Sequence, residues 1–281
     1  MQKTNFNSRP LTGHEMPATG EQVKENLRLM RSCVLNFDEG FDWDTPVYRV
    51  YPRCRLEQLF VDKKNTLVKP IMWDDPFENL VFRQKASLST GEPVSFEVVR
   101  EKYYGQCWTL NSKETDALWR IYSHDKEGVR VKTTLKRLFN GFFDPTNEYA
   151  LVSYYIGKVR YNTSEEIKLY YEKPENLSNI FDSSGQGAVQ TLLVKRSEFE
   201  HESEVRLIYV ASSDAEMGNG QLYKYNFDPI SILEELVFDP RYENSVFEEL
   251  KAKFIALGFA GTIERSTMYQ IPDFSLRFNP L

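Results

Sequence analysis

The chain has 281 residues, of which 41% are hydrophobic and 14% aromatic, so it can bury a substantial core. Its formal net charge is −6, with acidic and basic residues interspersed along the whole length, which argues against broad, non-specific adhesion to nucleic acid or anionic membranes. The three cysteines form no CxxC pair and the three histidines no helical pair. This pattern argues against a disulfide framework, a zinc ribbon or a zinc hydrolase, and favours the reducing cytoplasm.

The first twenty residues mix Pro, Gly, Asn and Thr without periodicity, which predicts a flexible arm over residues 1–20. They lack the apolar centre of a signal peptide, and no apolar run approaches the roughly 20 residues that a membrane span needs. We therefore expect a soluble cytoplasmic protein with no membrane part. No shift in composition marks a boundary, so residues 21–281 are expected to form a single domain.

Helical and strand patterns then alternate without a regular rhythm. Helices are expected over residues 21–35, 54–62, 95–103, 114–122 and 246–257. Runs of β-branched and aromatic residues predict strands at 47–51, 66–68, 105–110, 129–133, 151–161, 199–210, 222–227, 235–238 and 260–264. Many strands with unevenly placed helices between them indicate an α+β fold rather than a doubly wound one.

Two of these segments carry residues whose surroundings are ambiguous. Arg49 stands between apolar neighbours in the strand at 47–51, as either an ordinary edge-strand arginine or a ligand-binding one. Trp119 and Tyr122 lie at helical spacing in the segment 114–122, which is more typical of core residues than of a ligand-binding wall.

The strand at 199–210 carries the strongest candidates for chemistry. Alternate side chains of a strand share a face, so Glu202, Glu204 and Arg206 are expected on one ridge, roughly 7 Å apart. Arg206 would then hold Glu204 while the two acids address different atoms of a ligand. The alternative is a solvated strand face whose salt bridge contributes under about 1 kcal/mol.

A second acidic group lies in the turn at 72–79, where Asp74, Asp75 and Glu78 surround a proline. Such acids most often cap the following segment. They are also the hard oxygen ligands that Mg²⁺ prefers, which keeps a phosphodiesterase or nuclease among the alternatives.

Several stretches, taken together in their order and spacing, resemble the bacterial family known as domain of unknown function 2971 (DUF2971). The resemblance runs over residues 47–267 and rests on VYRV (47–50), WDDPFE (73–78), CWT (107–109), ALWRIYSHDKEGVRV (117–131), ESEVRLI (202–208), VFDPRYE (237–243) and ERST (264–267). It implies a distant relation to the ADP-ribosyltransferase fold, in which two small, mostly antiparallel sheets with flanking helices enclose a cleft for NAD.

The resemblance also implies roles for individual residues. Arg49 matches the first-strand arginine and would clamp a pyrophosphate oxygen of NAD. Glu204 would stabilise the oxocarbenium-like centre left when nicotinamide departs, and Glu202 would orient or deprotonate the acceptor. The expected serine-rich strand is absent, since Val-Lys-Pro stands at 68–70, and Thr109 is the candidate substitute.

Three further residues complete the expected site. Trp119 and Tyr122 would form an aromatic wall for nicotinamide, and Arg206 would hold Glu204 in its ionised form. NAD is the expected substrate, and no metal is expected.

The resemblance therefore implies an NAD-using ADP-ribosyltransferase or NAD glycohydrolase, acting in phage defence or as a toxin. The acceptor would be a protein or a nucleic acid, and a regulatory partner or antitoxin would accompany it. The alternative is a non-catalytic module on the same fold that binds a nucleotide, nucleic acid or protein. The missing serine-rich strand favours that alternative.

Overall fold

The structure is a computed structural model that describes residues 32–278 except 74, 76, 79, 88–89, 181–184 and 213–219. The expected arm at 1–20 and most of the expected first helix at 21–35 lie outside the described residues. The end of that helix was predicted wrongly, because Val34–Leu35 form a short strand, β1. It pairs in parallel with β8 (Tyr154–Lys158), so its backbone hydrogen bonds are made to a neighbouring strand.

Within the described residues, ten strands form one connected sheet in the order β1-β8-β11-β6-β2-β7-β13-β14, with β3 and β12 as a branch beside β6. β9 with β10 and β4 with β5 form two small separate sheets. The remaining strands are β2 (Pro46–Pro52), β3 (Lys64–Val68), β4 (Ala86–Ser87), β5 (Pro93–Val94), β6 (Tyr103–Thr109), β7 (Gly128–Thr134), β9 (Arg160–Asn162), β10 (Val194–Arg196), β11 (Glu204–Val210), β12 (Leu222–Asn226), β13 (Glu235–Phe238) and β14 (Thr262–Arg265).

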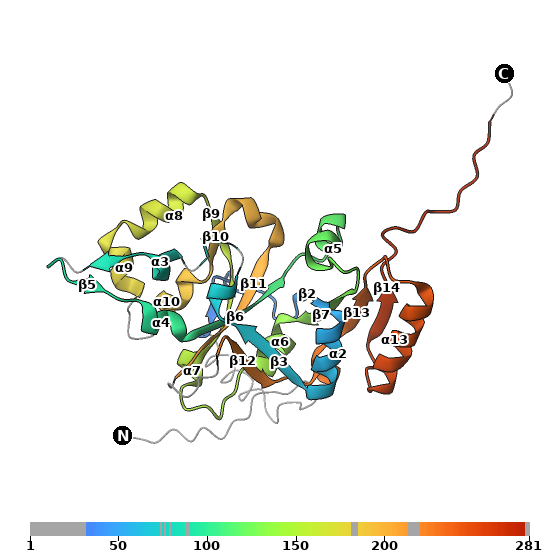
Figure 1. The fold of residues 1–281 in the computed structure, drawn as a ribbon, viewed down its shortest axis with the longest axis horizontal. Helices are drawn as coiled ribbons and strands as arrows, with labels where there is room; N and C mark the ends of the chain where they lie inside the picture. Colours follow the sequence, from blue (N-terminus) through green and yellow to red (C-terminus); the bar gives the residue numbers. More distant parts are fainter. Residues whose placement is uncertain are drawn as a thin grey trace.

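Two groups of helices lie on opposite sides of the molecule (Figure 1). α3, α4 and α8–α10 lie near the separate β9–β10 sheet, while α2, α5 and α13 lie beside the β7–β13–β14 end of the large sheet. Their bounds are α2 (Arg53–Asp62), η1 (Pro70–Met72), α3 (Leu80–Arg83), α4 (Glu97–Glu101), α5 (Asp116–Tyr122), α6 (Leu135–Phe142), α7 (Ala150–Ser153), α8 (Ser164–Tyr171), α9 (Pro174–Ile180), α10 (Gln186–Thr191), η2 (Ser197–Glu202), α12 (Pro229–Ile232) and α13 (Asn244–Ala256).

The large sheet consists of two groups of strands that meet at a narrow junction. β11 pairs with β6 along the whole of both strands, and β2 pairs in the same way with β7. β2 and β6, in contrast, share one ladder pair, Tyr48 opposite Thr109. The two small, mostly antiparallel sheets that the sequence predicts correspond to these two groups, which are joined rather than separate. The predicted α+β class is confirmed.

The strand predicted at residues 151–161 was wrong in detail. These residues do not form one run, because α7 precedes β8 and β9 follows it. Gly157 of β8 pairs with Arg206 on one side and Leu35 on the other, and a Cβ there would lie 2.3 Å from a methyl carbon of Leu193. The glycine therefore lets Leu193 pack directly on the strand.

Aromatic side chains fill the space on the β12 side of the large sheet. Tyr209 of β11 stacks on Tyr223 of β12 with ring centroids 3.8 Å apart, and Tyr154 and Phe142 meet edge to face at 5.0 Å. These large rings bury much apolar area per residue, so they stabilise the packing of the central strands.

A buried carboxylate, Asp239, fixes the turn between α5 and β7. Its Oδ2 accepts hydrogen bonds from Ser123 Oγ at 2.6 Å and from Arg241 at 2.5 Å. Ser123 Oγ also accepts from the Gly128 amide at 2.8 Å, and Arg241 donates to the Ser123 and Trp119 carbonyls at the end of α5. One carboxylate therefore joins β13, β7 and the last turn of α5.

We expect Asp239→Asn to lower the free energy of unfolding by about 2 kcal/mol, because it removes the charge that pairs with the partly buried Arg241. Urea unfolding followed by tryptophan fluorescence measures the loss. Asp62→Asn, which alters an exposed carboxylate at the end of α2, is the control and should change stability by less than about 0.5 kcal/mol. Equal stability of the two variants would contradict this view of the turn.

Candidate active site

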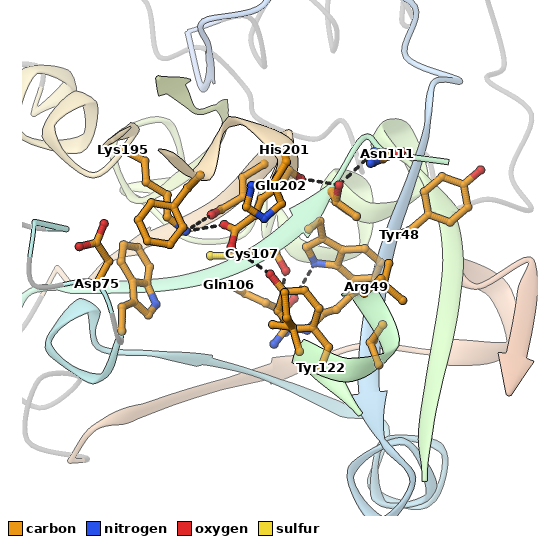
Figure 2. Close-up of a pocket in the computed structure, with 18 of the residues that line it drawn as sticks. Tyr48, Arg49, Asp75, Gln106, Cys107, Asn111, Tyr122, Lys195, His201 and Glu202 are labelled. Carbon is orange, nitrogen blue, oxygen red and sulfur yellow. Dashed lines mark hydrogen bonds and ion pairs between the residues drawn. The ribbon is translucent and has the colours of Figure 1, made fainter. Parts of the chain in front are cut away.

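A cavity of about 540 Å³ opens at the junction of the two strand groups. Its walls come from β2, β6, α5, η2 and the starts of β10 and β11, with Asp75 toward one end and Tyr48 toward the other (Figure 2). The volume lies in the range of about 300–1,000 Å³ that is typical of ligand and cofactor sites. The narrow β2–β6 contact creates this cavity, because strands paired along their whole length would leave no gap.

Three carboxylates surround the ammonium group of Lys195. Its Nζ lies 2.6 Å from Glu204 Oε1, 2.5 Å from Glu202 Oε2 and 3.1 Å from Glu78 Oε1. Burial opposes the charged form of Lys195, but the charges of Glu204 and Glu78 raise its pKa above the ordinary value. Lys195 is therefore a permanent cation that gathers the acids.

Arg206 lies fully buried beneath this group. Its Nε donates to Glu204 Oε2 at 2.8 Å, its second amino group to Glu78 Oε1 at 2.6 Å, and its first to the Leu192 carbonyl at 2.7 Å. The guanidinium also packs on the Trp73 ring at 4.4 Å. The cluster thus contains three carboxylates and two cations, an excess of one negative charge shielded from most of the solvent.

The two acids of the 202–204 motif are brought together differently from the prediction. Ser203 adopts φ +44°, which ends η2 and starts β11 at Glu204, so Glu202 lies on a 3₁₀ turn and not on the strand. The predicted ridge of three side chains is therefore wrong for Glu202. Glu204 and Arg206 do share a face and pair as expected, while Lys195 supplies the contact that joins Glu202 to them.

The two carboxylates differ in exposure and in pKa. Burial alone would raise the pKa of Glu204, but the charge of Arg206 and the hydrogen bonds around it hold that pKa far below its ordinary range. Burial raises the pKa of Glu202 to about 7, and the neighbouring Glu204 carboxylate adds to this effect while Lys195 opposes it. The Glu202 side chain is 16% exposed and that of Glu204 5%. One acid is a fixed charge, and the other titrates near neutrality.

Tyr122, from the last turn of α5, approaches the same acids from across the cavity. Its hydroxyl donates to Glu202 Oε1 at 3.2 Å, and its side chain remains about half exposed. Partial burial, followed by the charges of Glu202 and Glu204, raises the pKa of this phenol. It is therefore a hydrogen-bond donor throughout the neutral range.

Arg49 reaches the cavity from β2 and crosses the junction between the strand groups. One amino group donates to the Cys107 carbonyl of β6, and the guanidinium lies 5.2 Å from the centre of the Tyr51 ring. Its buried Nε has no hydrogen-bond acceptor, and no carboxylate pairs with it among the described residues. Arg49 and Glu204 therefore line one cavity, and only the acid is neutralised.

The other predicted residues lie in three different surroundings. Thr109 lines the cavity, but its hydroxyl donates to the Glu202 carbonyl at 2.5 Å and accepts from the Asn111 amide at 3.0 Å. Trp119 is fully buried with its Nε1 on Glu114, so it packs as a core residue away from the cavity. Arg206 is likewise no lining residue, and its contacts are with Glu204 and Glu78.

Sequence reasoning missed Lys195 and the role of Glu78. The only sequence signal for Lys195 is that it precedes the acidic run 198–204, a common arrangement on solvated surfaces. The other acids of the 72–79 turn are not gathered at one point: Asp75 pairs with Arg196 at 3.0 Å, and Asp74 lies outside the described residues. In the described part of the chain, no three His, Cys, Asp or Glu side chains are grouped so as to hold a metal ion.

The family model described as "Protein of unknown function (DUF2971)" matches residues 118–207, the stretch that contains Lys195 and the acidic pair. The family resemblance inferred from the sequence is confirmed over this segment. No curated protein matches the chain. Within the described ranges, no helix is both long and apolar enough to cross a lipid bilayer.

Solved structures of DarT from Thermus sp. 2.9 align with most of the chain at low TM-scores. The structure of DarT in complex with NAD+ is 12% identical with a TM-score of 0.36, covering 80% of this chain and 97% of DarT. The structure in complex with ADP-ribosylated ssDNA is 11% identical with a TM-score of 0.36, covering 82% and 98% of the two chains.

Proposed function

We propose that this protein breaks the bond between nicotinamide and ribose in NAD and transfers the ADP-ribose to an acceptor, as an ADP-ribosyltransferase, or to water, as a glycohydrolase. The observation that carries the proposal is the charge distribution of one cavity. An acid cluster that becomes net negative when Glu202 ionises lines it together with Arg49, which pairs with no carboxylate among the described residues.

The proposed reaction uses the acids in two roles. When the glycosidic bond breaks, its electron pair leaves with the nicotinamide nitrogen, and positive charge develops on the ribose carbon. Glu204, held ionised by Arg206 and Lys195, supplies the fixed negative charge that stabilises this centre. Glu202 then takes the proton of the attacking acceptor as the new bond forms, a task for which a pKa near 7 is well suited.

Arg49 and Tyr122 would position the substrate in this reaction. The unpaired donors of Arg49 fit a pyrophosphate oxygen, because guanidinium groups bind such oxygens through parallel hydrogen bonds. Tyr122 presents a half-exposed ring at the cavity and holds Glu202 through its hydroxyl. These contacts would bring the glycosidic bond to the acid cluster and the phosphates to Arg49.

The direct test is incubation of the purified protein with NAD, followed by chromatographic measurement of free nicotinamide. We expect nicotinamide release, with ADP-ribose found on a protein or nucleic-acid acceptor or free in solution. Absence of release, together with no labelled product after incubation with cell extract, would contradict the proposal.

The proposal also fixes the direction of the pH dependence. Glu202 must be ionised to accept a proton, so the rate should rise with pH through about 7 and level off above it. Nicotinamide release between pH 5.5 and 9 measures this profile. Glu198→Gln, at an exposed acid of η2, should leave the midpoint unchanged. A rate that is constant between pH 6 and 8 would argue against Glu202 as the base.

The finer parts of the proposal concern the acceptor and the cellular role. The family resemblance suggests an effector of phage defence or a toxin, with a protein or nucleic-acid acceptor and a partner that restrains it. Expression of the wild-type chain and of Glu202→Gln in the same cells tests this role. The proposal expects growth arrest from the wild type alone, and equal growth would count against a toxin.

A second candidate is a non-catalytic module that binds NAD or another nucleotide in the same cavity. The observation that favours it is the engagement of the Thr109 hydroxyl with the Glu202 carbonyl, since this hydroxyl is then not available to hold a ribose. Calorimetric binding of NAD without any nicotinamide release would support this candidate over the enzyme.

A further inference from the structure

Arg130 of β7 is a buried cation at the Tyr48 end of the cavity. It is 4% exposed, lines the cavity, and lies over the Tyr48 ring with its guanidinium carbon 4.0 Å from the ring centre. Tyr48 and Asn111 lie together at this end, whereas Lys195 and Asp75 lie toward the other end (Figure 2). Arg130 is thus separate from the acid cluster.

The guanidinium of Arg130 is poorly satisfied by the protein. One amino group donates to the Ser112 carbonyl at 2.6 Å, while the other is 3.8 Å from Glu114 Oε1, too far for a hydrogen bond. Its Nε is buried without an acceptor. Of its five N–H donors, one makes a hydrogen bond within the described residues, although the donors of buried charged groups are normally hydrogen-bonded.

Glu114 compensates the charge of Arg130 in part, through an ion pair at 3.8 Å that involves its Oε1. Its other oxygen, Oε2, accepts hydrogen bonds from Trp119 Nε1 at 3.2 Å and from the Ser266 hydroxyl. Glu114 itself does not line the cavity. Arg130 therefore lines the cavity with a charge that is partly balanced and with most of its donors not hydrogen-bonded within the described residues.

Lys113 adds a second positive charge to the lining of the same cavity. Its side chain is exposed, lines the cavity, and has no ion-pair partner among the described residues. Arg130 supplies a rigid planar fork to this lining, and Lys113 supplies a flexible point charge. A tetrahedral oxyanion matches this combination, because its oxygens can accept from the fork and from the ammonium group at once.

We infer that Arg130 and Lys113 form a subsite that binds a phosphate monoester or diester. This subsite is distinct from Arg49. The inference goes beyond the proposed reaction and needs no turnover. Two sources carry this chemistry: a phosphate of the dinucleotide, including the 2′-phosphate that distinguishes NADP from NAD, or a phosphate of the acceptor.

Titration calorimetry of the full chain with inorganic phosphate and with pyrophosphate tests the subsite. Arg130→Met should weaken binding at least tenfold, and Lys113→Ala severalfold, with the latter loss shrinking at high salt. The matched controls are Arg120→Met and Lys168→Ala, which alter exposed cations away from the cavity and should bind like the wild type. Unchanged binding in both Arg130→Met and Lys113→Ala would overturn the inference.

If Arg130→Met does not fold, Lys113→Ala and Arg130→Lys decide, because the first alters an exposed side chain and the second keeps the positive charge at position 130. Full wild-type affinity for phosphate in both variants would again overturn the subsite. Titration with NAD and NADP separates the sources. If Arg130→Met loses affinity for either dinucleotide, the phosphate belongs to that dinucleotide. If it loses affinity for inorganic phosphate alone, the phosphate belongs to the acceptor. A protein that releases no nicotinamide but binds phosphate through Arg130 would contradict the proposed function and leave this inference intact.

Discussion

Replacing Glu202 by Gln is expected to lower the rate of nicotinamide release by about 10²- to 10⁴-fold, the usual contribution of a positioned acid or base. The amide keeps the size of the side chain, and its one oxygen can still accept a hydrogen bond from Lys195 or from Tyr122, but it cannot take a proton. Because the charged form of Glu202 is disfavoured by burial and by Glu204, its removal should not weaken the fold.

Steady-state rates and thermal melts of the same preparations measure both effects. We expect an unchanged or slightly higher melting temperature together with the loss of rate. Glu198→Gln controls for the removal of one acid from η2 and should keep the wild-type rate. A Glu202→Gln protein within tenfold of the wild-type rate would exclude Glu202 from the chemistry.

The second large effect is on stability: Arg206→Met should lower the free energy of unfolding by about 3–5 kcal/mol. This change leaves three buried carboxylates around Lys195 as their single cation, and it removes three hydrogen bonds and the packing against Trp73. Urea unfolding measures the loss. Arg120→Met, which breaks an exposed pair on α5, is the control, and its change in stability should be far smaller than that of Arg206→Met.

A loss below about 1 kcal/mol in Arg206→Met would mean that the buried ion cluster does not hold the site together. The same reasoning applies to Glu204, whose two carboxylate oxygens are bound by Lys195 and Arg206. Glu204→Gln would take from Lys195 and Arg206 a carboxylate that both of them bind, so it should reduce both activity and stability. Glu202→Gln therefore separates chemistry from folding more cleanly than Glu204→Gln does.

Much of the fold near the site could be predicted because its strands have regular patterns. The runs at 47–51, 105–110, 129–133 and 235–238 are rich in β-branched and aromatic residues, and each is a strand. The strands at 235–238 and 260–264 and the helix between them were also predicted, and Gly258 follows α13 at φ +93°. The run at 199–210 was less predictable, because the left-handed Ser203 that divides it has no signature in the pattern.

Some residues that line the cavity could be predicted from the sequence, but the contacts that hold them could not. Arg49, Glu202 and Glu204 stood out as charges in unusual surroundings, and the structure brings them to one cavity. The Arg206–Glu78 pair joins residues 128 positions apart, a distance over which periodicity carries no information. Helical spacing likewise could not tell that α5 buries Trp119 and leaves Tyr122 about half exposed beside Glu202.

We propose that the acid cluster and Arg49 bind the two ends of one substrate. A crystal structure of Glu202→Gln with NAD would decide the matter. We expect the nicotinamide ribose beside Glu204 and residue 202, with a pyrophosphate oxygen on the Arg49 guanidinium. NAD bound outside this cavity, or bound within it with Arg49 touching no phosphate, would contradict this proposal.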